Sequence, residues 1–173
     1  MPTFDGDDVG RFYVGIDPGK QGGIAVVSGR RGVNWLAVHL TSMPTTDKDV
    51  LDYIEMYRVR HGNPSLAVIE KVGGYIAGNP APGSAMFNFG KGYGALCMAL
   101  VALEVSFEEV PPQRWQKAMG VGKRKKTETK TAWKNRLRSK AQQLYPDVPG
   151  ITLSTCDALL IATFCKRKHE GTL

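Results

Sequence analysis

The sequence has few residues that bind metal or cross-link through sulfur or imidazole. Its 173 residues include three cysteines, Cys97, Cys156 and Cys165, and three histidines. The cysteines lie in apolar segments, with no C-x-x-C spacing and no nearby histidine. We therefore expect free, buried thiols in a reducing compartment, which excludes a disulfide framework and a zinc site.

Long apolar runs are also missing. No run approaches the roughly 18–20 residues that span a bilayer, and the acidic N-terminus lacks the basic and apolar regions of a signal peptide. We expect no membrane partner and a cytoplasmic location, either at the nucleoid or, for a phage protein, in the host cytoplasm. The expected organisation is a loose tail over 1–10, one domain over 11–168 and a short tail over 169–173.

Acidic residues are scarce in one segment. Residues 111–140 contain 11 of the 23 basic residues but only one acid, Glu128. The remaining chain is slightly acidic, so this segment carries the whole basic excess of a chain with net charge +7. Such a segment is either a solvated charged helix or a phosphate-binding surface.

The periodicity of the remaining chain predicts an α/β fold. Three short β-rich segments joined by tight turns predict an antiparallel meander, and a strand that follows a helical crossover predicts parallel pairing with an earlier strand. Thr46 and Asp49 form a capping box before the first helix. The expected strands are 11–17, 22–28, 33–40, 65–72 and 105–110. The expected helices are 50–62, 85–104, a short one from 112, 130–146 and 153–168.

Three carboxylates stand at informative places. Asp17 and Glu70 end apolar strands, and Asp157 lies in the first turn of an apolar helix. If the two strands are parallel neighbours, both acids emerge at one sheet edge, where they need a proton or a cation between them. Oxygen-only ligands suit Mg²⁺ or Mn²⁺. The alternatives are exposed strand-end acids and a helix-dipole partner.

The turn after Asp17 contains little side-chain bulk. Gly22 and Gly23 leave room for a backbone or a phosphate to approach. The turn does not match the P-loop pattern, so it does not predict nucleotide binding.

Five motifs in order carry a family resemblance that covers about residues 11–166. They are "VGIDPGKQGGIAVV", "AVIEKV", "MFNFGKGYGAL", "VPPQRWQKAMG" and "CDALLIA". The chain resembles the RuvC-type Holliday junction resolvases, in the phage and bacterial branch that is similar to plant organelle resolvases. The resemblance implies a ribonuclease H-like mixed five-stranded sheet with helices on both faces, a homodimer, and one or two divalent ions. It places the family's catalytic, metal-binding acids on Asp17, Glu70 and Asp157, and it implies paired nicks in four-way DNA.

The sequence departs from the family at one position. Members usually carry an acid or histidine one turn before the last aspartate, whereas this chain has Leu153 and Ser154. Either the Ser154 hydroxyl contributes weakly to catalysis, or the second metal site is poor, or the chain is slow or inactive.

Further residues are candidates for contact with four-way or branched DNA. Tyr75 either wedges against an unstacked base or covers apolar surface. Gly90 and Gly94, four apart on one helix, allow close approach either of a second copy or of the sheet. The candidate phosphate-binding residues are Lys20, Lys71, Lys123, Arg124, Lys125, Lys126, Lys130 and Lys134.

Three alternative functions stay open at this point. An actin-like phosphotransferase shares "GIDPG" but needs a second nucleotide-binding half, for which 173 residues leave no room. A catalytically weak or inactive branched-DNA-binding protein would explain the departure at Ser154. A nuclease of the same fold could act on RNA–DNA hybrids or other branched DNA. No small-molecule cofactor is expected.

Overall fold

The computed structural model describes residues 11–29, 36–61, 66–73 and 83–173. Strands β1 (Arg11–Asp17), β2 (Gly23–Gly29) and β3 (Leu36–Ser42) form the expected antiparallel meander. Strand β4 (Leu66–Glu70) pairs in parallel with β1, and β5 (Phe107–Val110) pairs in parallel with β4. The five-stranded mixed sheet has the order β3-β2-β1-β4-β5, which confirms the predicted fold class.

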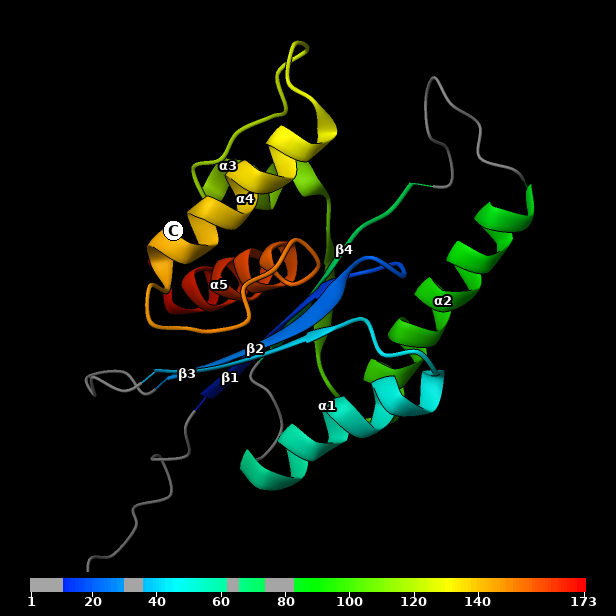
Figure 1. The fold of residues 1–173 in the computed structure, drawn as a ribbon. Helices are drawn as coiled ribbons and strands as arrows, with labels where there is room; N and C mark the ends of the chain where they lie inside the picture. The colour runs from blue at the N-terminus through cyan, green and yellow to red at the C-terminus, as the bar shows by residue number, and fades with distance from the viewer. Residues whose placement is uncertain (1–10, 30–35, 62–65, 74–82) are drawn as a thin grey trace, which may run out of the picture.

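Helices cover both faces of the sheet (Figure 1). Helices α1 (Asp47–His61) and α2 (Gly83–Ala102) pack on one face. Helices α3 (Pro112–Ala118), α4 (Lys130–Leu144) and α5 (Cys156–Glu170) pack on the other.

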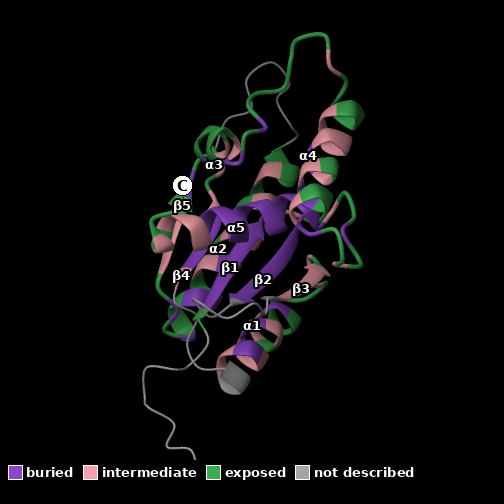
Figure 2. Ribbon diagram, turned by 90° about the vertical axis from the view of Figure 1, so that its left-hand side faces the viewer, coloured by how far each residue is buried: buried purple, intermediate pink, exposed green. Residues whose placement is uncertain are grey.

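The central strand β1 contributes to two separate cores. Tyr13 points toward the α5 side, whereas Val14 and Ile16 point toward α1 and α2, as expected for side chains that alternate along a strand. Helix α5 is buried from Cys156 to Cys165, so Figure 2 shows it and the central strands in the same buried colour. The middle of the sheet is therefore a rigid platform for residues at its edge.

Helix α5 approaches the sheet closely at one glycine. A Cβ atom on Gly15 would lie 2.2 Å from the carbonyl oxygen of Ala158 and 2.3 Å from the amide nitrogen of Ala162. The α5 backbone therefore rests directly on β1, where no side chain larger than hydrogen fits. This contact sets the height of α5, and of Asp157 in its first turn, above the sheet.

The predicted element boundaries are close to those observed. The capping box is confirmed, since the Thr46 amide and hydroxyl donate to Asp49 and the Asp49 amide donates back to the Thr46 hydroxyl. The last helix begins at Cys156 rather than 153, because the Thr155 hydroxyl bonds to the Gly150 carbonyl and holds the chain in a turn. That helix continues to Glu170. Within the described ranges, none of the helices is long and apolar enough to cross a bilayer.

Candidate metal and nucleic-acid site

Asp17 and Glu70 lie side by side at one edge of the sheet. Strands β1 and β4 are parallel with Ile16 opposite Ile69, so the next residue of each strand is one of the two acids. Between their first residue and the acid, both strands are apolar and buried. The sheet therefore fixes the backbone positions of Asp17 and Glu70. This confirms the prediction that the two acids lie at the same edge of the sheet.

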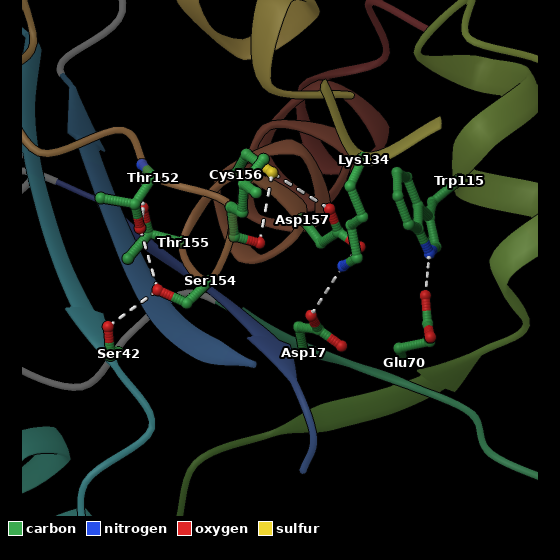
Figure 3. A network of polar contacts seen from close by, with 11 residues as sticks. Asp17, Ser42, Glu70, Trp115, Lys134, Thr152, Ser154, Thr155, Cys156 and Asp157 are labelled. Atoms are coloured by element: carbon green, nitrogen blue, oxygen red, sulfur yellow. Dashed lines mark hydrogen bonds and ion pairs between the residues drawn. The ribbon is translucent and has the colours of Figure 1, made fainter. Parts of the chain in front are cut away.

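Asp157 joins them from above the sheet. It is buried in the first turn of α5, and the contact of α5 with Gly15 holds that turn over the end of β1. Asp17, Glu70 and Asp157 line the same cavity (Figure 3). Three acids distant in sequence thus lie around one space.

A lysine lies between two of these acids. The Nζ atom of Lys134, on α4, is 2.6 Å from Oδ2 of Asp157 and 3.7 Å from Oδ2 of Asp17. Lys134 therefore belongs to the carboxylate cluster as well as to the basic segment in which the sequence placed it as a phosphate contact.

Burial dominates the electrostatics of the site. It raises the pKa of Asp17 to about 7, and the neighbouring Asp157 charge adds to this, against the opposing effect of Lys134. Burial also raises the pKa of Glu70, although the hydrogen bond from Trp115 opposes it. Burial alone would lower the pKa of Lys134, but the charges of Asp157 and Asp17 raise it. The site thus contains more negative charge than one lysine balances, which favours a further cation.

Two partners of these acids were missed by the sequence analysis. The indole nitrogen of the buried Trp115 donates to Oε2 of Glu70 at 2.7 Å, and the Cys156 thiol donates to Oδ1 of Asp157 at 3.2 Å. Each bond fixes the direction of its carboxylate. The second oxygen of Asp157, Oδ2, is the one that Lys134 contacts. Trp115 stands in the motif "VPPQRW". The motif alone does not indicate that the indole contacts Glu70.

The donor set fits a hard divalent cation in kind. All three candidate ligands are carboxylates, which suit Mg²⁺ or Mn²⁺, and the raised pKa of Asp17 marks a buried acid whose charge lacks compensation. Within the described ranges, no three side chains of the Asp, Glu, His and Cys types lie close enough together to hold one ion. The cation between Asp17 and Asp157 in this structure is the Lys134 ammonium.

Ser154 points away from the carboxylates. Its hydroxyl is 2.8 Å from that of Ser42 on β3 and 2.9 Å from that of Thr152 (Figure 3). The turn before α5 is therefore tied to the end of β3, the outer strand of the meander, two strands away from Asp17. The Ser154 hydroxyl therefore makes hydrogen bonds to Ser42 and Thr152 and to none of the three carboxylates.

The glycines after Asp17 accommodate backbone. A Cβ atom on Gly22 would lie 2.0 Å from the carbonyl oxygen of Asp17, and one on Gly23 would lie 2.6 Å from that of Thr41. Of the two occupants that the sequence allowed, the structure shows a backbone. These glycines let the turn fold tightly beneath the Asp17 carboxylate.

The cavity that the acids line has a volume of about 550 Å³ and is also lined by basic residues. Lys123, Arg124, Lys130 and Lys134 line it, together with Gln113, Gln116 and Trp133, which the sequence analysis did not select. Of the other predicted phosphate contacts, Lys20, Lys71, Lys125 and Lys126 are exposed outside this lining. Tyr75 lies outside the described residues.

One ion pair organises the loop that carries these cations. The Arg136 guanidinium donates to both carboxylate oxygens of Glu128, to the Val121 carbonyl and to the Lys123 carbonyl. Glu128 also accepts the Lys125 amide at 3.1 Å. The single acid of the basic segment therefore has a structural partner, and we call the Glu128–Arg136 pair the loop clamp.

Helix α2 presents an apolar face to solvent. Phe87, Met98 and Val101 are 72%, 61% and 56% exposed, and Gly90 and Gly94 lie between them at the spacing of one helix face. Both glycines are exposed, and a Cβ atom on either would meet nothing within 4 Å. One of the two predicted alternatives, that these glycines pack against the sheet, is therefore wrong.

Comparison with solved structures gives two informative matches. The chain is similar to RuvC from Thermus thermophilus solved alone, with a TM-score of 0.56, and solved in complex with a Holliday junction substrate, with a TM-score of 0.57. Each match covers 92% of this chain and 96% of the other, at 18% sequence identity. This chain has the RuvC fold. The predicted ribonuclease H-like architecture is thereby confirmed over nearly the whole chain.

Sequence comparisons add nothing to the structural match. No family model matches the chain, and no curated protein matches it either. At 18% identity the likeness to RuvC establishes the fold and not the activity.

Proposed function

We propose that this chain is an endonuclease that resolves four-way DNA junctions by metal-dependent hydrolysis of phosphodiester bonds. The observation that carries the proposal is the position of Asp17, Glu70 and Asp157, which line one cavity together with four basic residues. A protein of the same fold has been solved with a Holliday junction substrate, which supports four-way DNA as the substrate class.

The three carboxylates are the proposed metal ligands, with Mg²⁺ or Mn²⁺ as one or two bound ions. The chemistry that such ions supply is activation of water and stabilisation of charge on the phosphate oxygens. Trp115 orients Glu70 and the Cys156 thiol orients Asp157, so the ligands are directed before substrate arrives.

The basic wall of the cavity is the proposed phosphate contact. Lys123, Arg124 and Lys130 line it within reach of the same space as the acids, and Lys20, Lys71, Lys125 and Lys126 are proposed to extend this contact along the exposed surface. Because each phosphate contact releases counterions, binding should weaken steeply with salt. An affinity that hardly changes from about 50 to 200 mM salt would exclude this surface.

A homodimer through α2 is the proposed assembly. The exposed stripe of Phe87, Gly90, Gly94, Met98 and Val101 is apolar, and its two glycines allow a second helix to approach closely. Two copies would place two carboxylate clusters on one junction, which the paired cuts of a resolvase require.

The decisive test uses an end-labelled synthetic four-way junction in Mg²⁺, in Mn²⁺ and in EDTA, with Asp17→Asn as the control. We expect paired nicks that require metal and disappear in the variant. Linear duplex and an RNA–DNA hybrid, added as competitors, distinguish a junction enzyme from a nuclease with another substrate. Nucleotide-dependent phosphoryl transfer by the wild-type chain would instead favour the phosphotransferase alternative.

A binding protein without cleavage is the second candidate. It is favoured by Ser154, whose hydroxyl faces Ser42 and Thr152 and leaves the cluster without a fourth group. Tight, salt-sensitive junction binding with no nicks in either metal would support it and would contradict the nuclease proposal.

A further inference from the structure

Lys134 occupies the space where two candidate metal ligands face each other. Its Nζ atom lies 2.6 Å from Asp157 and 3.7 Å from Asp17, and these acids come from α5 and β1. The Lys134 side chain is 27% exposed, whereas those of Asp17 and Asp157 are 12% and 9% exposed. The ammonium therefore reaches inward from the cavity to the two buried carboxylates.

The Lys134 ammonium competes with a metal ion for Asp17 and Asp157. One positive charge between two carboxylates supplies part of the compensation that a divalent cation would supply in full. A divalent cation cannot bind both oxygens while the ammonium remains in contact with them, because the two cations would compete for the same lone pairs and repel each other.

We infer that Lys134 is an internal counter-cation, which holds Asp17 and Asp157 in the metal-free chain and is displaced when a divalent cation binds. This inference rests on the proposed function. It assigns Lys134 a role distinct from that of its neighbours in the basic segment: it controls access of metal to the cluster.

The surroundings of Lys134 allow such a displacement. Its side chain is long and flexible and lines the cavity together with Lys123, Arg124 and Lys130. A displaced ammonium would remain in this cavity, where a DNA phosphate would provide a new negative partner. Metal and DNA would therefore each favour binding of the other, and this coupling must be reciprocal.

The first test measures Mn²⁺ binding by electron paramagnetic resonance in the absence of DNA. Lys134→Met removes the charge and keeps most of the length of the side chain, and Lys130→Met is the matched control on the same helix and the same cavity. We expect K134M to bind Mn²⁺ at least about tenfold more tightly than wild type, and K130M to differ by no more than about threefold. Equal affinity of K134M and K130M would overturn the inference.

A second test uses the wild-type chain and does not depend on the folding of a variant. Amine-reactive labelling followed by mass spectrometry reports the accessibility of each lysine. Saturating Mg²⁺ should increase labelling of Lys134 by at least about threefold and leave Lys130 unchanged. Labelling of Lys134 that does not respond to Mg²⁺, in a chain shown to bind the ion, would overturn the displacement.

The two tests separate failure of this inference from failure of the proposed function. Wild type that binds Mn²⁺ as tightly as K134M removes the role of Lys134 and leaves the metal site intact. Absence of Mn²⁺ binding in wild type, K134M and K130M alike would contradict both the inference and the metal-dependent nuclease.

Discussion

Asp17 is a buried acid whose ionisation is energetically unfavourable in the folded chain. The β1 strand and the tight Gly22 turn leave the Asp17 residue 9% exposed, and burial with the charge of Asp157 raises the pKa of its carboxyl group to about 7. Such a group destabilises the metal-free fold in its ionised form, which is common where binding of a cation later compensates the charge.

Asp17→Asn should therefore stabilise the metal-free chain in a pH-dependent manner. Between about pH 4 and pH 7 the unfolded wild-type chain loses the Asp17 proton while the folded chain keeps it, so wild-type stability falls as pH rises through this window. Asn does not titrate, so the advantage of D17N should grow across the window, toward at most about 4 kcal/mol, and then level off. Urea unfolding in EDTA from pH 4 to pH 8 measures it.

Asp147→Asn controls for the loss of one negative charge, since Asp147 is exposed after α4. Mg²⁺ at pH 8 should stabilise wild type and reduce the advantage of D17N. Parallel stability curves of D17N and wild type at every pH would show that Asp17 is not held protonated.

At the scale of elements, two contacts bring together segments that are distant in sequence. Gly15 lets α5 rest on β1 and sets the position of Asp157. The loop clamp ties residues 121–128 to α4, with the Arg136 guanidinium 4.4 Å from the centre of the Trp133 ring on the cavity wall. The first contact arranges the acids and the second arranges the cations.

Gly15→Ala should destabilise the fold and separate Asp157 from Asp17. The added methyl group would lie 2.2 Å from the Ala158 carbonyl oxygen, so α5 has to move, at a cost of about 1–3 kcal/mol in unfolding free energy. Gly92→Ala, on α2 but outside the apolar stripe, is the matched control, because nothing lies within 4 Å of its added methyl group and helix propensity should raise stability by up to about 1 kcal/mol. Denaturant unfolding compares them, and equal stabilities would contradict the close contact.

Glu128→Ala tests the loop clamp, because the change in charge and the loss of the clamp should have opposite effects on DNA affinity. The change makes the basic loop more positive, so charge alone would tighten DNA binding. Loss of the clamp should instead weaken junction binding by about fivefold or more, lower its salt slope and speed trypsin cleavage at residues 123–126. Asp147→Ala, with the same change in charge beyond the other end of α4, should show none of these effects. Tighter binding by E128A with an unchanged cleavage rate would show that the clamp does not order the loop.

At the scale of the whole molecule, the two faces of the sheet have separate roles. The α3, α4 and α5 side carries the acids and the basic wall, while the opposite side carries α2 with its exposed apolar stripe. Association through α2 would therefore leave the carboxylate cavity of each copy open to DNA.

Met98→Glu should convert the proposed dimer into a monomer without loss of fold stability. Met98 is 61% exposed in the single chain, so the cost appears only when a second copy buries the charge. Sedimentation equilibrium should show a dissociation constant raised by at least about tenfold. Leu173→Glu, also at a site that is 61% exposed, is the control and should stay dimeric. A monomeric wild type would exclude the α2 dimer.

The sheet, its helices and the places of the three acids in them are predictable from the sequence alone. Apolar alternation, the Thr46–Asp49 capping box and the glycine turn are local signals, and parallel pairing after a crossover follows from chain geometry. These features suffice to place Asp17 and Glu70 at one sheet edge, because each acid directly follows an apolar strand segment in the sequence.

The surroundings of those acids depend instead on tertiary packing. Lys134 and Trp115 reach the cluster from α4 and α3, and Ser154 turns toward Ser42, 112 positions away. No local pattern encodes these contacts, since each depends on how closely helices pack on the sheet, and at Gly15 that distance is set by the absence of a single side chain.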